Sequence, residues 1–233
     1  MSLSASLVAA FGLLSLAAVV QAQTSETPSI VTQGEATITV APDRAFIQLA
    51  AEGRAPKAAE AQRIAAEAMA SLQAAVRGAG VTSDAIRTTG YSLAAEYDWP
   101  NGKQTFRAYV ARNQVEVRVD DLSKLSTILD AGGTSGASSI SGLRFDLKDR
   151  TSVEQTALKQ AVADALSRAT AIAAGASHTL GPIIRIQEQR VLQPSPIQYR
   201  TTMAAEASRA TPIEPGEIEI RAEVVLTVAI AGK

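Results

Sequence analysis

Few residues in this sequence could perform chemistry. The chain has no cysteine and a single histidine, His178, so thiol catalysis, disulfides, thiolate zinc sites and imidazole clusters are excluded. Glu96 and Asp98 lie two residues apart in a strand-like stretch, so their carboxylates would share a face, as a pair of catalytic acids requires. No phosphate-binding glycine pattern is present, and Gly133–Gly136 lacks the spacing of a nucleophile elbow. We therefore expect no catalytic, metal-binding or cofactor-binding residue.

These polar residues also have simpler structural interpretations, which we favour. His178 follows a long helical stretch, where a histidine stabilises the helix end. Glu96 and Asp98 fall at the tip of an expected hairpin, and Gly133–Gly136 reads as a connector. The sequence thus predicts a non-enzymatic protein that works through contacts.

Aromatic residues concentrate in one hairpin, although only 4% of the chain is aromatic. Residues 88–99 and 104–120 have strand-like patterns and are joined through Pro100–Gly102, a strong turn signal. Aromatic side chains there could form an interface or line a groove, or they could be cross-strand packing pairs. The sequence leaves these alternatives open for Tyr91, Tyr97, Trp99, Phe106 and Tyr109.

A second candidate contact surface lies near the C-terminus. Every second residue from 218 to 230 is apolar, and charged residues alternate with them over 217–223, which predicts a strand with one buried and one exposed face. The charged residues of the exposed face are Glu217, Glu219, Arg221 and Glu223. The chain as a whole has 22 basic and 23 acidic residues, so no basic surface indicates nucleic-acid binding.

The first residues are typical of an export signal. Residues 3–20 contain no charged side chain and are followed by Val20-Gln21-Ala22, a pattern that signal peptidase recognises, although no Lys or Arg precedes the apolar run. We predict cleavage after Ala22, a polar linker over 23–29 and no membrane span in the mature chain. In a Gram-negative bacterium this would place the protein in the periplasm.

The remaining chain, residues 30–233, is expected to form one α+β domain with a flexible loop near 193–216. Hydrophobic residues make up 46% of the sequence and charged residues 19%, as in globular proteins. The pattern predicts an N-terminal strand and two strand–helix–strand–strand units, with the helices packed on one face of a mainly antiparallel sheet. The two long helices are alanine-rich, which permits close packing, and the second begins at a capping box, Thr151–Glu154.

Four stretches together resemble the SIMPL-domain family, and the resemblance covers about residues 30–230. They are 84–93 (DAIRTTGYSL), 109–117 (YVARNQVEV), 121–125 (DLSKL) and 136–143 (GASSISGL). The resemblance implies an exported bacterial protein of the periplasmic immunogenic, outer-membrane-associated antigen type. Members have no agreed enzymatic activity, so no catalytic residue is carried over.

The resemblance further implies a link to envelope or oxidative stress and assembly into ring-like homo-oligomers. We therefore expect a homo-oligomer with possible contacts to envelope proteins. The alternative is a module that binds a ligand or peptide against the sheet, which a concave pocket beside the aromatic residues would favour. A third hypothesis is a hydrolase, which would need convergent acids or a polarised nucleophile and which the residues support least.

Overall fold

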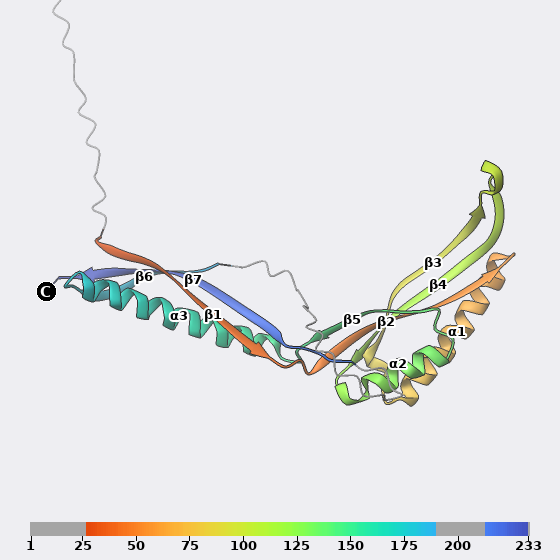
Figure 1. Cartoon of the computed structure of the whole chain (residues 1–233), viewed down its shortest axis with the longest axis horizontal. Helices are drawn as coiled ribbons and strands as arrows, with labels where there is room; N and C mark the ends of the chain where they lie inside the picture. Colours follow the sequence, from red (N-terminus) through yellow and green to blue (C-terminus); the bar gives the residue numbers. More distant parts are fainter. Residues whose placement is uncertain (1–26, 190–212, 233) are drawn as a thin grey trace, which may run out of the picture.

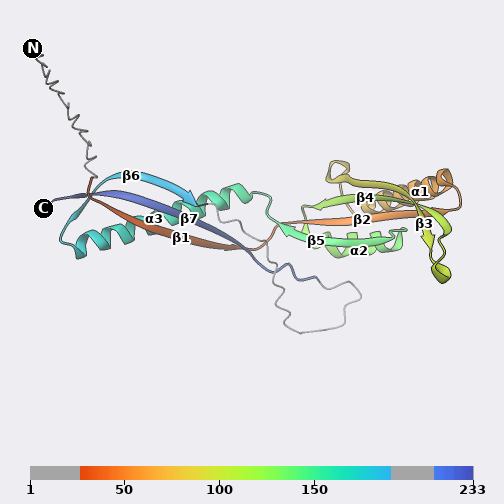
Figure 2. The same cartoon turned by 90° about the horizontal axis from the view of Figure 1, so that it is seen from above.

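The computed structural model describes residues 27–189 and 213–232, which form two antiparallel sheets lying end to end (Figures 1 and 2). The predicted α+β class and the antiparallel pairing are confirmed. The strands are divided between two sheets, however, where the sequence pattern suggested one. The expected export signal and most of both the linker and the 193–216 loop lie outside the described residues.

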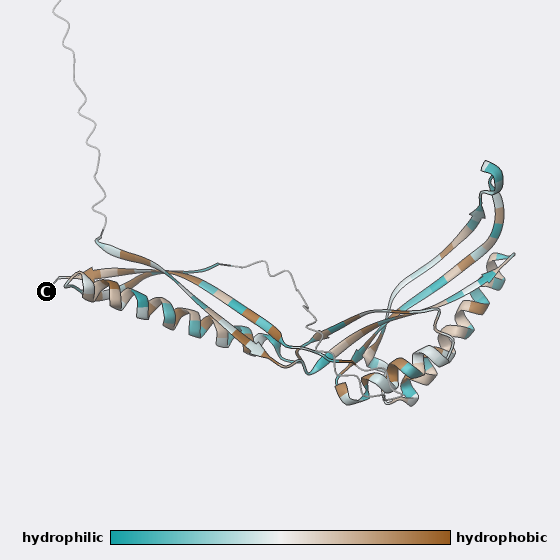
Figure 3. Cartoon of the chain, in the orientation of Figure 1, coloured by the Kyte–Doolittle hydropathy of each residue, from teal (hydrophilic) through white to brown (hydrophobic). Residues whose placement is uncertain are grey.

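Sheet A has the strand order β1-β7-β6. Strand β7 (Ile218–Ala231) pairs on one side with β1 (Ser29–Val40) and on the other with β6 (Thr179–Gln189). Helix α3 (Arg150–Gly175) packs mainly on β1 and β7. Figure 3 shows the alternating hydropathy along β7, and the predicted buried face is confirmed at Ile220, Ala222, Val224, Leu226 and Val228.

Sheet B has the strand order β3-β4-β2-β5. Its strands are β2 (Arg44–Ala55), β3 (Ile86–Asp98), β4 (Thr105–Val119) and β5 (Ser139–Asp146). Helices α1 (Ala58–Gly78) and α2 (Leu125–Thr134) cover one face, and short 3-10 turns lie at Ser83–Ala85, Pro100–Gly102 and Leu122–Lys124. The core between these two helices and the sheet includes Ile47, Leu49, Leu72, Val117 and Ile128.

The two sheets repeat one arrangement. Strand β2 is followed by α1, β3 and β4, and these strands lie in the order β3-β4-β2. In sheet A the equivalent order is β6-β7-β1, with α3 as the helix. In sheet A the strand equivalent to β2 is therefore β1, which lies much earlier in the chain than α3. Strand β5 precedes α3 in the chain, but it pairs with β2 and forms the edge of sheet B.

The start of α3 differs from the capping box that the sequence suggested. Asp149, two residues upstream of Thr151, is the N-cap residue, and its Oδ1 accepts a hydrogen bond from the Ser152 backbone N–H at 3.0 Å. An aspartate at this position satisfies one of the unpaired N–H groups of the first turn. The helix consequently begins at Arg150.

Candidate interaction surfaces

The β3–β4 hairpin lies at the free edge of sheet B and ends in the expected turn (Figure 1). Asn101 and Gly102 in that turn have φ values of 54° and 77°, the left-handed conformation that Asn-Gly adopts at little cost. We call the five side chains that sequence analysis singled out here the aromatic hairpin. Four are exposed and Tyr109 is half-buried; the exposed fractions are 56% for Tyr91, 44% for Tyr97, 65% for Trp99 and 44% for Phe106.

Three rings of the aromatic hairpin are in contact, one pair of them across the two strands. Tyr97 and Phe106 are register partners, with ring centroids 6.0 Å apart and planes at 77°. Phe106 also contacts Tyr109, with centroids 5.2 Å apart. The hydroxyl of Tyr91 accepts a hydrogen bond of 3.0 Å from the Gln62 side chain on α1. Tyr97 and Phe106 thus form one cross-strand pair, and core burial is excluded for the four exposed side chains.

The two acids near the hairpin tip are held in ion pairs. Glu96 Oε2 lies 2.7 Å from Arg54 Nη1 on β2, and Asp98 Oδ1 lies 3.4 Å from Arg107 Nη1 on β4. Asp98 thus pairs with the adjacent strand β4, and Glu96 reaches across β4 to β2, an arrangement that stabilises the hairpin. This geometry supports the interpretation of Glu96 and Asp98 as structural residues.

The charged surface near the C-terminus lies on the other sheet. Glu219 and Arg221 are exposed on the face of β7 that is opposite α3, Glu217 is exposed just before the strand, and Glu223 is half-buried. Glu223 pairs in register with Glu35 of β1, so two like charges face each other. Like charges directly opposite each other destabilise a strand pair. Because the aromatic hairpin belongs to sheet B and this charged surface belongs to sheet A, the two candidate surfaces lie on different sheets.

A network of ion pairs on the open face of sheet B was not anticipated from the sequence. The Glu52 carboxylate lies 2.6 Å from Arg112 Nη2 and 2.7 Å from Arg54 Nε. The hydrogen bond from Arg112 lowers the pKa of Glu52, an effect that outweighs burial of the carboxylate and is reinforced by Arg54. Alternate residues of β2 and β4 carry these groups, but only the strand register shows which arginine meets which acid.

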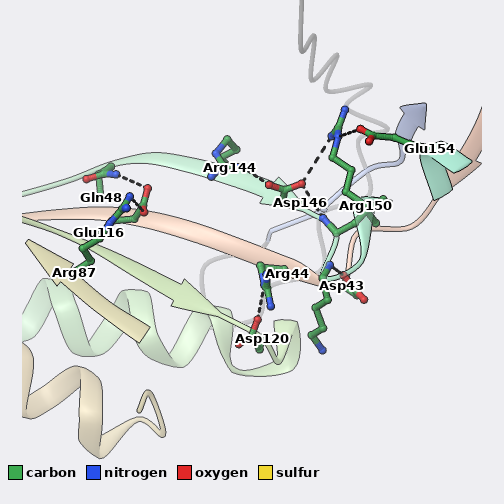
Figure 4. A network of polar contacts seen from close by, with 12 residues as sticks. Asp43, Arg44, Gln48, Arg87, Glu116, Asp120, Arg144, Asp146, Arg150 and Glu154 are labelled. Carbon is green, nitrogen blue, oxygen red and sulfur yellow. Dashed lines mark hydrogen bonds and ion pairs between the residues drawn. The ribbon is translucent and has the colours of Figure 1, made fainter. Parts of the chain in front are cut away.

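The connection between the two sheets carries a second polar network (Figure 4). Asp43, between β1 and β2, accepts a hydrogen bond of 2.7 Å from the Lys148 backbone N–H, and its own N–H donates to the Asp146 carbonyl at 3.2 Å. The Asp146 carboxylate binds Arg144 at 2.5 Å and the Leu147 N–H at 2.9 Å. Burial raises the pKa of Asp146, but these two donors and the nearby Arg150 outweigh it and lower that pKa.

Ion pairs also hold strands of sheet B together near this connection. Arg44 Nε on β2 lies 2.6 Å from Asp120 Oδ1, and Arg118 Nε lies 3.0 Å from Asp120 Oδ2. Burial raises the pKa of Asp120, but its hydrogen bonds with the two arginines lower it by more. Glu52, Asp120 and Asp146 therefore serve as fixed negative charges between arginines.

The other candidate residues occupy structural positions. His178 follows α3, and its Nδ1 lies 2.7 Å from the Ala176 carbonyl oxygen, consistent with a role at the helix end. The Ser135 hydroxyl donates to the Ala131 carbonyl at 2.6 Å, so Gly133–Gly136 continues the end of α2 rather than forming a free connector. Within 27–189 and 213–232, no group of three or more acidic or histidine side chains is placed to hold a metal ion.

A concave pocket beside the aromatic residues would have favoured the ligand-binding alternative, but the groove that the structure describes lies elsewhere. An apolar groove lies between α2 and β5, at the edge of sheet B opposite the aromatic hairpin, and no aromatic residue lines it. None of the helices in the described part of the chain is long and apolar enough to cross a membrane.

Comparison with known sequences gives the family. The SIMPL family, described as proteins of unknown function (DUF541), matches residues 30–228. The 26 kDa periplasmic immunogenic protein of Brucella melitensis is 32% identical over 220 residues, which cover 91% of this chain and 88% of the relative. The uncharacterized protein YggE of Escherichia coli is 28% identical over 171 residues, covering 73% and 70% of the two chains. With nearly the whole described chain matched, this protein belongs to the SIMPL family.

Proposed function

We propose that this chain is an exported periplasmic protein that self-associates through the aromatic hairpin and has no enzymatic activity of its own. In this proposal the signal segment is cleaved after Ala22, and residues 30–233 act as one SIMPL-like unit with a role in the cell envelope or in oxidative stress. The periplasmic name of the Brucella relative supports the compartment. Intact-mass measurement of protein recovered from the periplasm would test whether the mature chain begins at Gln23.

One observation carries the proposal of self-association. Four large aromatic side chains on one hairpin at a sheet edge are 44–65% exposed, and two of them, Tyr97 and Phe106, are in contact. Exposed apolar surface of this kind is unfavourable in water and marks contact sites in soluble proteins. Within the described residues no strand pairs with the outer edge of β3, which leaves backbone groups there that a second copy could use.

The test is the particle mass of the mature chain with and without the aromatic side chains. We expect Tyr97→Ala combined with Trp99→Ala to reduce the mass measured by size-exclusion chromatography with light scattering. Both side chains are exposed, so their loss leaves the core intact. A circular dichroism melt would verify that the variant stays folded.

The matched control removes exposed apolar side chains from sheet A. Val31→Ala with Ile184→Ala deletes residues that are 64% and 52% exposed, and this variant should keep the wild-type mass. An unchanged mass in the aromatic variant, or an equal loss in both variants, would count against the hairpin as the contact surface. Glu219→Lys would probe the charged surface of β7 separately.

A further inference from the structure

The two sheets have separate hydrophobic cores. The core of sheet A is formed mainly by α3 and β7, and the core of sheet B mainly by β2, β4, α1 and α2. Within the described residues, every extensive packing contact lies inside one sheet and the helices and turns that belong to it. Two units without a large shared apolar interface are expected to move relative to each other. What fixes their arrangement therefore lies where the chain passes between them.

The chain passes between the sheets through short segments outside the helices and strands (Figure 1). Residues 41–43 join β1 to β2, and residues 147–149 join β5 to α3. Residues 213–217 lead from the core of sheet B, which Ile213 contacts, into β7. Segments of this kind absorb the backbone rotation when two units swing about a hinge.

The first two of these segments are each fixed to a different sheet. Asp43 directly precedes β2, and its N–H donates a hydrogen bond of 3.2 Å to the carbonyl oxygen of Asp146, the last residue of β5. Lys148 lies between Leu147, which is buried in the core of sheet A, and Asp149, which caps α3. Asp43 is therefore attached to sheet B, and the Lys148 backbone is attached to sheet A.

A short hydrogen bond joins these two residues across the boundary between the sheets (Figure 4). The Oδ1 atom of Asp43 accepts it from the Lys148 backbone N–H at 2.7 Å. A carboxylate acceptor makes such a bond stronger than a neutral acceptor would. Pro42, just before Asp43, is buried and has a fixed φ, which restricts rotation next to the bond. The ion pair of Arg150 with Asp146 spans the same boundary, but its atoms are 3.9 Å apart.

We propose that residues 41–43 and 147–149 form a hinge between the two sheets, and that the hydrogen bond from Lys148 to Asp43 locks this hinge in the bent arrangement of Figure 1. With the lock closed, sheet A and the β3–β4 hairpin at the far end of sheet B keep one relative direction. With the lock open, the two units swing while each keeps its own core. This inference is independent of the proposed self-association, because the hinge is remote from the hairpin tip (Figure 1).

The experiment measures a distance between the two units in the mature chain. The sequence has no cysteine, so nitroxide labels on Ser71→Cys of α1 and Ser167→Cys of α3, both exposed positions, report only on the chosen sites. Double electron–electron resonance gives the distribution of label distances, and an excess of unlabelled chain keeps each measured pair within one copy. We expect one narrow distribution when the hinge is unchanged. Asp43→Ala, which removes the acceptor, should widen this distribution about twofold.

Further variants separate the lock from a general loss of structure. Lys148→Pro removes the N–H donor from the other side of the bond and should widen the distribution as Asp43→Ala does. Asp43→Asn keeps an acceptor oxygen and should leave the distribution narrow. The matched control is Asp121→Ala, which removes a carboxylate that accepts a hydrogen bond of 3.2 Å from the Ser123 N–H within sheet B. This control should also leave the distribution narrow, and circular dichroism melts would verify that every variant is folded.

Several outcomes would overturn the proposal. A wide distribution in the chain with an unchanged hinge would show that the hydrogen bond does not lock it. An unchanged width in Asp43→Ala and Lys148→Pro would show that the bond does not set the arrangement of the sheets. Equal widening in Asp121→Ala, or widening in Asp43→Asn as large as in Asp43→Ala, would also contradict a lock made by this hydrogen bond.

Discussion

Helix α3 on sheet A and helix α1 on sheet B meet their sheets through the same contact and then continue differently. A Cβ at Gly34 would overlap the backbone of Ala161 and Ala165 of α3, and a Cβ at Gly53 would overlap the backbone of Ala61 and Ala65 of α1. Beyond this point α3 continues to bury alanines, whereas α1 turns to larger side chains. The buried residues after the contact are Ala169 and Ala173 in α3, and Met69, Leu72 and Val76 in α1.

This difference shows two ways of building a core on one repeated frame. In sheet A the helix lies close along its length, and the large buried side chains come from strands such as β7. In sheet B the first part of α1 lies in close contact with the sheet, and its later part covers a thicker core that α2 and β5 also enclose. Sheet A should therefore depend on close approach, and sheet B on the volume of its core side chains.

The largest effect should come from the shared glycine contact. Gly34→Leu and Gly53→Leu should each lower the free energy of unfolding by more than about 3 kcal/mol, because helix and strand must separate to admit the side chain. Urea denaturation would measure both. Gly175→Ala, where an added Cβ meets nothing within 4 Å, is the control and should change stability by less than about 0.5 kcal/mol. A small loss of stability at only one of the two glycines would show that the two helix–sheet contacts are not equivalent.

Truncating a helix side chain should distinguish the two cores. Leu72→Ala in α1 should cost about 3 kcal/mol, because it removes a fully buried side chain from the thick core. Ala165→Gly in α3 removes one methyl group and should cost about 1 kcal/mol, most of it helix propensity. Thermal and urea melts of both variants would measure the ratio. Equal losses would mean that the two cores respond alike despite their different composition.

The polar network between the sheets should give a smaller, pH-dependent effect. Asp146→Asn should lower the free energy of unfolding by about 1.5 kcal/mol at pH 7, because a carboxylate that accepts hydrogen bonds from Arg144 and Leu147 is lost. The pKa of Asp146 is lower in the folded chain. Its stabilisation is therefore complete above the unfolded pKa of about 3.9 and is lost as pH falls through the lower folded pKa.

Melts of wild type and Asp146→Asn at intervals down to about pH 2 would measure this dependence, and the two stabilities should converge at the acid end. Asp98→Asn, at the exposed hairpin tip, is the control at pH 7 and should have a much smaller effect. A constant gap between wild type and Asp146→Asn at every pH would show that the carboxylate charge is not what stabilises this connection.

The sequence was sufficient for features whose cause is local. Alternation along β7, the Asn-Gly turn and the glycines that follow the helices predict their elements because each depends on a few neighbouring residues. The aromatic hairpin was also identified from local pattern, and its exposure on an edge strand required the sheet order. The contact role of the aromatic hairpin and of Glu217–Glu223 stays a prediction.

The features that the sequence did not reveal depend on long-range pairing. That β1 rather than β5 completes sheet A follows from the register of Gly34 with Val224, far along the chain. The pairing of Glu52 with Arg112 and the α2–β5 groove likewise arise only when β2, β4 and β5 are brought side by side. Single-sequence periodicity shows which side of a strand is buried, but it does not identify the neighbouring strand.

The smallest effect should come from exposed ion pairs on the two long helices. Arg168 of α3 lies 3.0 Å from Asp164 and 3.7 Å from Glu35 of β1, whereas Arg63 of α1 pairs with Glu67, one turn away in the same helix, at 2.9 Å. Arg168→Ala should cost about 0.5 kcal/mol and Arg63→Ala about 0.3 kcal/mol, because exposed pairs are screened by water and salt. Melts at low and high salt would measure the loss of stability in both variants. The loss in Arg168→Ala should shrink more at high salt, because this variant also leaves Glu35 facing Glu223 without its nearby cation. If Arg63→Ala lost more stability than Arg168→Ala, or lost the same amount at low and high salt, the ion pair between α3 and β1 would contribute no more than a pair within one helix.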